Sequence, residues 1–91
     1  MSTLTGTIPT PRGARYAKQL AGHWREKAEV TERPDGSVAF LMEGGASATL
    51  TPREDDLRVE ASSAEFGEVV RRHLERFGTR EELTLVWDDE A

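Results

Sequence analysis

The sequence predicts an α+β fold, a two-layer sandwich in which two helices lie on one face of a mostly antiparallel, curved sheet of five or six strands. Two stretches carry apolar residues at helical spacing, and elsewhere apolar and polar residues alternate with the period of a strand. Short segments rich in proline, glycine and aspartate separate the alternating stretches, which favours a meander. The expected order of elements is β-α-β-β-β-β-α-β.

The N-terminal part of the chain predicts one strand and one helix. Residues 4–8 alternate between apolar or glycine positions and threonine. Thr10 then places a capping hydroxyl before Pro11, and proline suits the first helical position. Apolar side chains at four-residue spacing predict a helix over residues 11–27 whose apolar face packs on the sheet, and they are Tyr16, Leu20 and Trp24.

Alternating residues between positions 29 and 62 predict the central strands. The pattern is clearest in residues 38–42, 46–50 and 57–61. Pro34, Asp35 and Gly36 predict a turn, because proline presets φ and glycine accepts a positive φ. Residues 44–45 and 52–56 supply the next two breaks, and each break is short enough to join antiparallel neighbours.

The C-terminal part predicts a second helix and a last strand. Ser62 and Glu65 form a capping box that opens the helix, and Gly78 is expected to close it as a left-handed cap. The apolar face of this helix comprises Phe66, Val69, Val70, His73, Leu74 and Phe77. The last strand is predicted by the alternating positions Leu83, Leu85 and Trp87.

Length and charge fit one small acidic domain that spans residues 1–91. The 91 residues include 12 lysines and arginines and 17 aspartates and glutamates, a net charge of −5. The lack of cysteine excludes disulfides, thiolate zinc sites, iron–sulfur clusters and a cysteine nucleophile. Apolar runs are far shorter than a membrane span, and the first nine residues lack the features of a signal peptide, so we expect a cytoplasmic protein outside the membrane.

Basic residues concentrate in and around the first helix. Residues 1–27 contain five lysines and arginines and one glutamate, a net charge of +4, whereas residues 28–91 contain seven basic and 16 acidic residues, a net charge of −9. The helix N-terminus adds free backbone N–H groups beside Arg12 and Arg15, which favours a binding site for a carboxylate or phosphate group. The alternative is a solvated helix that neutralises acidic neighbours.

Two histidines lie on the apolar faces of the predicted helices, His23 beside Leu20 and His73 between Val69 and Phe77. We expect both to face inward or to line an edge. Helices that pack side by side would bring them together in a metal, haem or proton-transfer site. The alternative is that each imidazole is a hydrogen-bonded core residue. A metal site also needs carboxylates, and the candidates are Glu26, Glu60 and Glu75.

Several other chemistries find no support in the sequence. The acidic balance and the lack of a recognised motif disfavour nucleic acid as a partner. The chain contains no glycine-rich phosphate loop, no dinucleotide fingerprint and no nucleophile elbow around a serine. Nucleotide binding and serine catalysis are therefore not expected.

Several short motifs in the chain have an order and spacing typical of one bacterial family. They are Thr10-Pro11, Arg15-Tyr16, Lys18-Gln19-Leu20, His23-Trp24, Lys27, and His73-Leu74-Glu75-Arg76-Phe77 running into Arg80-Glu81-Glu82-Leu83. Together with the strand that ends at Trp87, they resemble the domain of unknown function 2218 family over nearly the whole chain. One departure is Gly78-Thr79, where the family usually has a more apolar run.

The resemblance implies a small stand-alone domain without an established activity. It also implies an association of some members with siderophore-interacting, iron-acquisition proteins. The positions that match the family overlap residues already singled out by helical geometry, and they are Tyr16, His23, Lys27, His73 and Arg80.

The favoured hypothesis is a non-catalytic binding or accessory module. Its basic first helix would hold an anionic small molecule, such as a siderophore-like compound or its ferric complex, or a siderophore-related partner protein. The candidate ligand-binding residues are Arg12, Arg15, Tyr16, His23, Lys27, His73 and Arg80.

Two further hypotheses belong to other functional classes. The first is a small metal-dependent or histidine-based enzyme that uses His23 and His73, so catalysis, metal and cofactor stay open at this point. The second is a homodimer in which another copy covers an exposed sheet face that carries Ala39, Leu41 and Val86.

Overall fold

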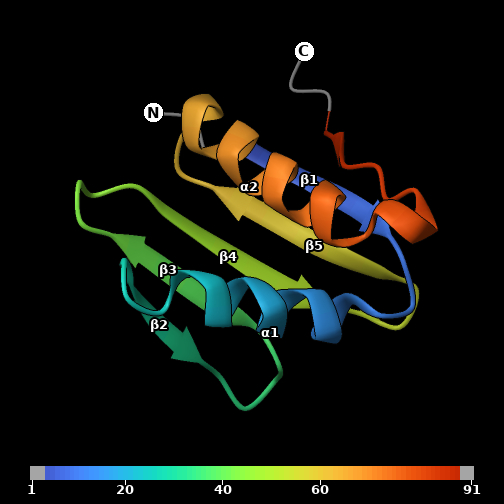
Figure 1. Ribbon diagram of the computed structural model, residues 1–91, viewed down its shortest axis with the longest axis horizontal. Coiled ribbons are helices and arrows are strands. Elements are labelled where there is room, and N and C mark those ends of the chain that lie inside the picture. The colour runs from blue at the N-terminus through green and yellow to red at the C-terminus, as the bar shows by residue number, and fades with distance from the viewer. Residues whose placement is uncertain (1–3, 89–91) are drawn as a thin grey trace.

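The computed structural model describes residues 4–88, which form one six-stranded sheet and two α-helices (Figure 1). In chain order the elements are β1 Leu4–Pro9, α1 Gly13–Trp24, β2 Ala28–Glu32, β3 Val38–Met42, β4 Ser47–Pro52, β5 Asp56–Ala61, α2 Ala64–Phe77, a 3₁₀ helix η1 at Thr79–Glu81, and β6 Val86–Trp87. The predicted α+β class and the predicted order of elements are both confirmed.

The sheet is antiparallel at every junction, and its strand order is β2-β3-β4-β5-β1-β6. Strands β2 to β5 form the predicted meander. The N-terminal strand β1 then pairs with β5, from Leu4 opposite Ala61 to Pro9 opposite Asp56. Both helices lie side by side on one face of the sheet (Figure 1), where α1 contacts β3 and β4, and α2 contacts β4 and β5.

The core lies between the helices and the sheet, and it is filled by the apolar positions of the predicted patterns. Its fully buried large side chains include Ile8, Leu20, Phe40, Leu50, Leu57, Val59, Val70 and Leu74. Burial of each such side chain contributes about 1.5–3 kcal/mol. The alternate positions of β1, β4 and β5 face away from the helices and are polar, and they are Thr5, Thr7, Thr49, Thr51, Arg58 and Glu60.

The first helix is shorter than the predicted span of residues 11–27. It begins at Gly13, because the Thr10 hydroxyl accepts a hydrogen bond from the Arg12 backbone N–H at 3.0 Å and closes a turn before the helix. The helix ends at Trp24, and the Lys27 N–H donates to the Trp24 carbonyl in a turn that leads into β2. The predicted apolar face is confirmed, since Tyr16, Leu20 and Trp24 are all buried.

The prediction of Ser62 as the cap of the second helix is wrong by one residue. Ser63 is the N-cap, and its hydroxyl accepts from the Phe66 N–H at 3.2 Å. The Ser62 hydroxyl instead accepts from the Ser47 N–H at 2.9 Å and ties the end of β5 to β4. Two adjacent serines can both cap, and the chain path out of β5 decides between them.

Gly78 ends α2, but it is not the left-handed cap that the sequence predicts. Its φ is −102°, and its N–H donates to the Leu74 carbonyl. The reason for glycine is close packing, because a Cβ at this position would overlap the Leu83 side chain. The left-handed residue is Glu82, with a φ of 56°, and it turns the chain from η1 toward the last strand.

The last strand is shorter than predicted and contains only Val86 and Trp87. The alternation is nevertheless correct, because Leu83 and Leu85 are buried against the core and Val86 is exposed. Within residues 4–88, neither helix has the length and apolar character needed to cross a membrane.

Candidate functional site

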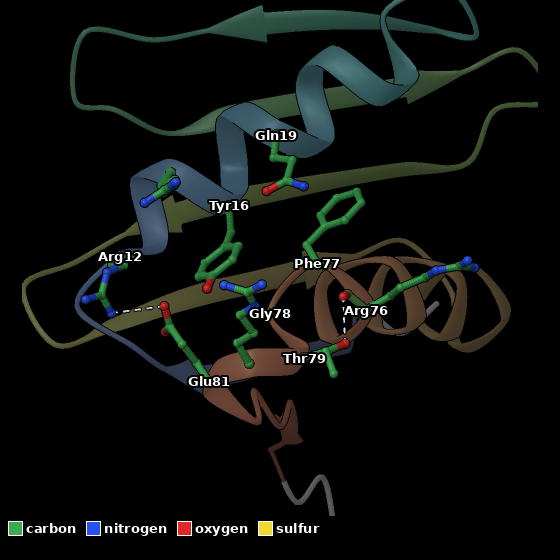
Figure 2. A pocket seen from close by; sticks show the side chains of 10 residues that line it. Arg12, Tyr16, Gln19, Arg76, Phe77, Gly78, Thr79 and Glu81 are labelled. Atoms are coloured by element: carbon green, nitrogen blue, oxygen red, sulfur yellow. Dashed lines mark hydrogen bonds and ion pairs between the residues drawn. The ribbon is translucent and has the colours of Figure 1, made fainter.

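A pocket of about 540 Å³ opens where the first half of α1 meets the end of α2 and η1. Figure 2 shows the pocket, with Tyr16 and Gln19 pointing from α1 toward the segment that follows α2. Its volume falls within the usual range for small-molecule sites. We call it the arginine pocket, and it is lined by Arg12, Arg15, Tyr16, Gln19, Arg76, Phe77, Gly78, Thr79, Arg80 and Glu81.

Helical spacing brings the α1 side of the arginine pocket together. Arg12, at the N-cap, lies about one turn before Arg15 and Tyr16, and Gln19 lies about one turn after them, so the side chains share one edge of the helix. The Tyr16 ring is only 6% exposed and belongs to the core, which anchors this edge.

The opposite side of the pocket depends on the turn after α2. Gly78 lets Leu83 pack against the end of the helix, and η1 then presents Arg80 and Glu81 beside α1. The Thr79 hydroxyl donates to the Arg76 carbonyl at 2.8 Å (Figure 2), which stabilises the same turn.

An ion pair joins the two sides of the pocket. The Arg12 guanidinium lies 2.9 Å from the Glu81 carboxylate (Figure 2), which also accepts from the Thr10 hydroxyl at 3.4 Å. The two side chains are 54% and 29% exposed, so the pair contributes at most about 1 kcal/mol and chiefly orients Arg12.

The lining of the pocket is strongly positive although the chain is acidic. Four arginines face one carboxylate, in a protein whose net charge is −5. Within residues 4–88, Arg15, Arg76 and Arg80 take part in none of the ion pairs. In Figure 2 the Arg76 side chain extends away from Tyr16, so it lies at the rim of the pocket.

Tyr16 supplies a neutral hydroxyl at the base of the pocket. Burial raises the pKa of this hydroxyl above its usual value, and the nearby Glu81 carboxylate raises it further, while Arg12 and Arg15 act in the opposite direction. The phenol therefore stays protonated at neutral pH and can donate a hydrogen bond to an anion.

The two histidines meet at the seam between the helices, as the sequence predicts. The ring centroids of His23 and His73 are 5.1 Å apart, with an angle of 55° between the planes. The Phe77 ring contacts both from the side of the arginine pocket, at 5.9 and 6.3 Å, and the Trp24 ring lies 5.0 Å from His73.

Of the two placements expected from the sequence, the imidazoles take the second: they line an edge of the helical layer and do not face inward. His23 is exposed and His73 is half-buried, because other residues already fill the sheet-facing sectors of the two helices. Those residues are Leu20 and Trp24 in α1, and Val70 and Leu74 in α2. The histidine pair therefore lies on the solvent side of the helical layer.

The three carboxylates considered as metal ligands do not join the histidines. Glu60 lies on the sheet face opposite the helices, because it pairs with Thr5 and Thr49. Glu75 accepts from the Leu85 N–H at 2.9 Å and from Arg71 at 3.0 Å. Glu26 lies in the turn after α1. No cluster of three or more histidine, aspartate or glutamate side chains suited to a metal ion occurs in residues 4–88.

The structure thus divides the candidate residues into three places. Arg12, Arg15, Tyr16 and Arg80 line the arginine pocket, and His23 and His73 form the adjacent pair. Lys27 lies apart, in a shallow surface hollow beside Glu26, Glu29 and Glu43.

Besides Gly78, sequence reasoning missed five residues whose side chains line the pocket, namely Gln19, Arg76, Phe77, Thr79 and Glu81. Gln19 lies four residues after Arg15 on the same helical edge, so spacing could have found it. The other four come to the pocket only through the packing of α2 beside α1, which no local pattern encodes.

Comparison with known proteins agrees with this description of the fold. The chain is similar to the solved NMR structure of PA4090 from Pseudomonas aeruginosa, with a TM-score of 0.77 and 28% sequence identity. The alignment covers 97% of this chain and 96% of that one. None of the curated proteins compared with the chain matches it.

A family model described as "uncharacterized protein conserved in bacteria" (DUF2218) matches residues 5–88, which include both helices and all six strands except Leu4. The motifs that suggested this family, from Thr10-Pro11 to Leu83, all fall within the matched region. The chain therefore belongs to the DUF2218 family, the domain of unknown function 2218.

Proposed function

We propose that this protein is a non-catalytic binding or accessory module that holds a small organic anion in the arginine pocket. The observation that carries the proposal is that Arg12, Arg15 and Arg80 line one pocket of about 540 Å³ together with Tyr16. The arginines come from segments more than sixty positions apart in the sequence, so the positive lining is a product of the fold.

The chemistry of the lining favours carboxylate or phosphate groups. Guanidinium groups donate two parallel hydrogen bonds to such anions, and they stay charged at any physiological pH. The protonated Tyr16 hydroxyl and the Gln19 amide add neutral donors. Phe77 offers an apolar wall, which suits an organic anion with a hydrophobic part.

The same lining supports binding over catalysis. It contains no histidine, serine or cysteine, and the Thr79 hydroxyl is hydrogen-bonded to the Arg76 carbonyl. The Glu81 carboxylate is paired with Arg12.

The family resemblance supplies a finer version of the proposal, in which the anion is a siderophore-like compound or its ferric complex. Such a complex presents several anionic oxygens, which the group of guanidiniums could meet together. A siderophore-related partner protein would bind to the same arginines through an acidic segment of its own. The cytoplasmic location also remains a prediction.

Titration with citrate, a small polycarboxylate, tests the proposed site by isothermal calorimetry on the full chain. Arg15→Gln and Arg80→Gln remove pocket charges, and Lys18→Gln and Arg72→Gln remove the same charge from exposed positions of α1 and α2 outside the pocket. A charge-assisted hydrogen bond is worth about 1.5–3 kcal/mol, so each pocket variant is expected to weaken citrate binding by roughly tenfold or more.

The two control variants are expected to change citrate affinity much less, because solvent screens their charges. If the pocket variants and the control variants weakened citrate binding equally, citrate would respond only to the overall charge of the protein. That result would rule out a citrate-binding site in this pocket. Ferric citrate in the same assay then tests the proposal that the ligand is the ferric complex of a siderophore-like compound.

A further inference from the structure

The histidine pair has the spacing of two imidazoles that share one metal ion. Metal–nitrogen distances of about 2.0–2.1 Å and the size of the ring place the centroids of two such imidazoles roughly 4.5–5.5 Å apart. The separation between His23 and His73 is 5.1 Å. Because the two side chains come from different helices, this spacing is set by the packing of α1 beside α2.

The hydrogen bond of His73 leaves one of its nitrogens available to a ligand. Its Nδ1 lies 2.7 Å from the Val69 carbonyl oxygen, which only accepts, so Nδ1 carries the proton and donates. Nε2 is then the nitrogen with a free lone pair in the neutral ring. A hydrogen bond of this type, donated by the ring nitrogen that does not hold the metal, orients metal-binding histidines and raises their basicity.

Because His23 is exposed, its ring can change orientation to bind a metal ion together with His73. His23 lies on the solvent side of α1, where its ring can rotate toward the point that faces His73. The Phe77 and Trp24 rings pack around His73 and limit its movement. One imidazole is thus held in place, and the other can adjust to an ion.

We infer that His23 and His73 together bind one divalent transition-metal ion of the copper, nickel or zinc type at the seam between α1 and α2. Imidazole nitrogen suits these ions, whereas magnesium and calcium prefer oxygen ligands. Two protein ligands leave the remaining coordination positions to water or to a small anion, so the site is an exchangeable one. Structural zinc sites, in contrast, have four protein ligands.

Positive charges near the histidine pair lower its affinity for a metal ion. Arg72 and Arg76 line a shallow hollow with His73, and their positive charge disfavours a bare cation. An ion whose open positions hold an anion carries less charge and is disfavoured less. This site adjoins the arginine pocket, with which it shares Arg76 and Phe77, but the inference does not depend on the proposed function.

The composition of the chain makes a direct test possible. His23 and His73 are the only histidines, and cysteine is absent, so no other imidazole or thiol competes for the ion. The full chain, prepared without a histidine tag, is titrated with Cu²⁺ at about pH 7.5, where free imidazole is mostly neutral. Electron paramagnetic resonance then counts the imidazole nitrogens on the bound copper.

The expected result for the unaltered chain is one copper ion per chain with two imidazole nitrogens. In His23→Gln and in His73→Gln, one nitrogen should remain and the affinity should fall by at least about tenfold, because the advantage of two linked ligands is lost. Lys18→Gln, on the same helix as His23, should keep both nitrogens and the original affinity. Two separate ions with one nitrogen each would overturn the inference, as would saturation only at millimolar copper.

A second measurement protects the test against a variant that simply fails to fold. Zn²⁺ should raise the midpoint of thermal unfolding of the unaltered chain, because an ion held by both helices binds the folded state alone. His23→Gln should retain its fold, since His23 is exposed, and should lose the zinc-dependent rise. An equal rise in both proteins would contradict a shared site.

Discussion

Glu81→Gln is the most informative single substitution for the arginine pocket, because Glu81 is its only carboxylate. The change removes the partner that Arg12 holds at 2.9 Å and replaces it by an amide of similar shape. Two unit charges about 4 Å apart interact by about 1 kcal/mol with water-like screening, which corresponds to about a fivefold change in Kd. Removal of the negative charge should therefore tighten citrate binding by roughly this factor.

The same substitution should lower the pKa of the Tyr16 hydroxyl, because the Glu81 carboxylate is one of the causes that raise it. Burial, the largest cause of the raised pKa, persists in the variant. Tyr16 is the only tyrosine in the chain, and ultraviolet absorption of the phenolate therefore reports it alone. The fold should be nearly unaffected, since exposed ion pairs contribute about 0–1 kcal/mol.

Calorimetry with citrate and the ultraviolet titration measure the two effects on the same protein. Weaker citrate binding by Glu81→Gln would contradict this expectation, because Glu81 would then support the ligand instead of repelling it. An unchanged pKa of Tyr16 would show that the carboxylate does not act on the hydroxyl. Glu82→Gln, in the next residue and outside the pocket lining, is the matched control.

Three further predictions concern the fold. Ser63→Ala should lower the free energy of unfolding by about 1 kcal/mol through loss of the N-cap, and chemical denaturation should show a smaller loss for Ser62→Ala if the cap is assigned correctly. Leu74→Ala should cost about 2–5 kcal/mol, because the side chain is completely buried, and an unchanged denaturation midpoint would contradict that burial. The backbone and hydroxyl hydrogen bonds from Ser37 lower the pKa of Asp35, so their contribution is present above the ordinary carboxyl pKa and is lost as pH falls through the lowered value. Asp35→Asn should show a smaller loss of stability in acid, measured as the denaturation midpoint against pH.

The homodimer also remains a prediction. Leu41 and Val86 are 49% and 59% exposed, as the hypothesis requires. Their strands β3 and β6 are separated by β4, β5 and β1 in the sheet, so the two side chains do not form one continuous patch. The mass in solution, from light scattering, distinguishes one copy from two.

The fold was largely predictable because its elements have strong local patterns. Tyr16, Leu20 and Trp24 mark the buried face of α1 by spacing alone, and the alternation at Leu83 and Leu85 identifies the inward side chains even where regular pairing is absent. Element ends were less predictable, because they depend on tertiary contacts. Ser63 and not Ser62 caps α2, since the path out of β5 gives Ser62 a different partner.

The candidate site was predictable only on its α1 side. Arg12, Arg15 and Tyr16 follow from helical spacing and charge, and the meeting of His23 with His73 follows from two helices on one sheet face. The pairing of Arg12 with Glu81 joins residues 69 positions apart and requires the path of η1. The sequence left open whether the histidines face inward or line an edge, because the burial of a residue at the border of an apolar helical face depends on how closely the neighbouring helix packs.

The most direct test of the anion pocket is an NMR titration that follows the guanidinium Nε–H signals of the full chain as citrate is added. We expect saturable shifts for Arg12, Arg15 and Arg80, together with small, linear shifts for Arg25 at the C-terminal end of α1 and for Arg58 on the sheet face opposite the helices. Shifts of equal size in both groups, or none that saturate, would contradict a binding site built by α1 and η1.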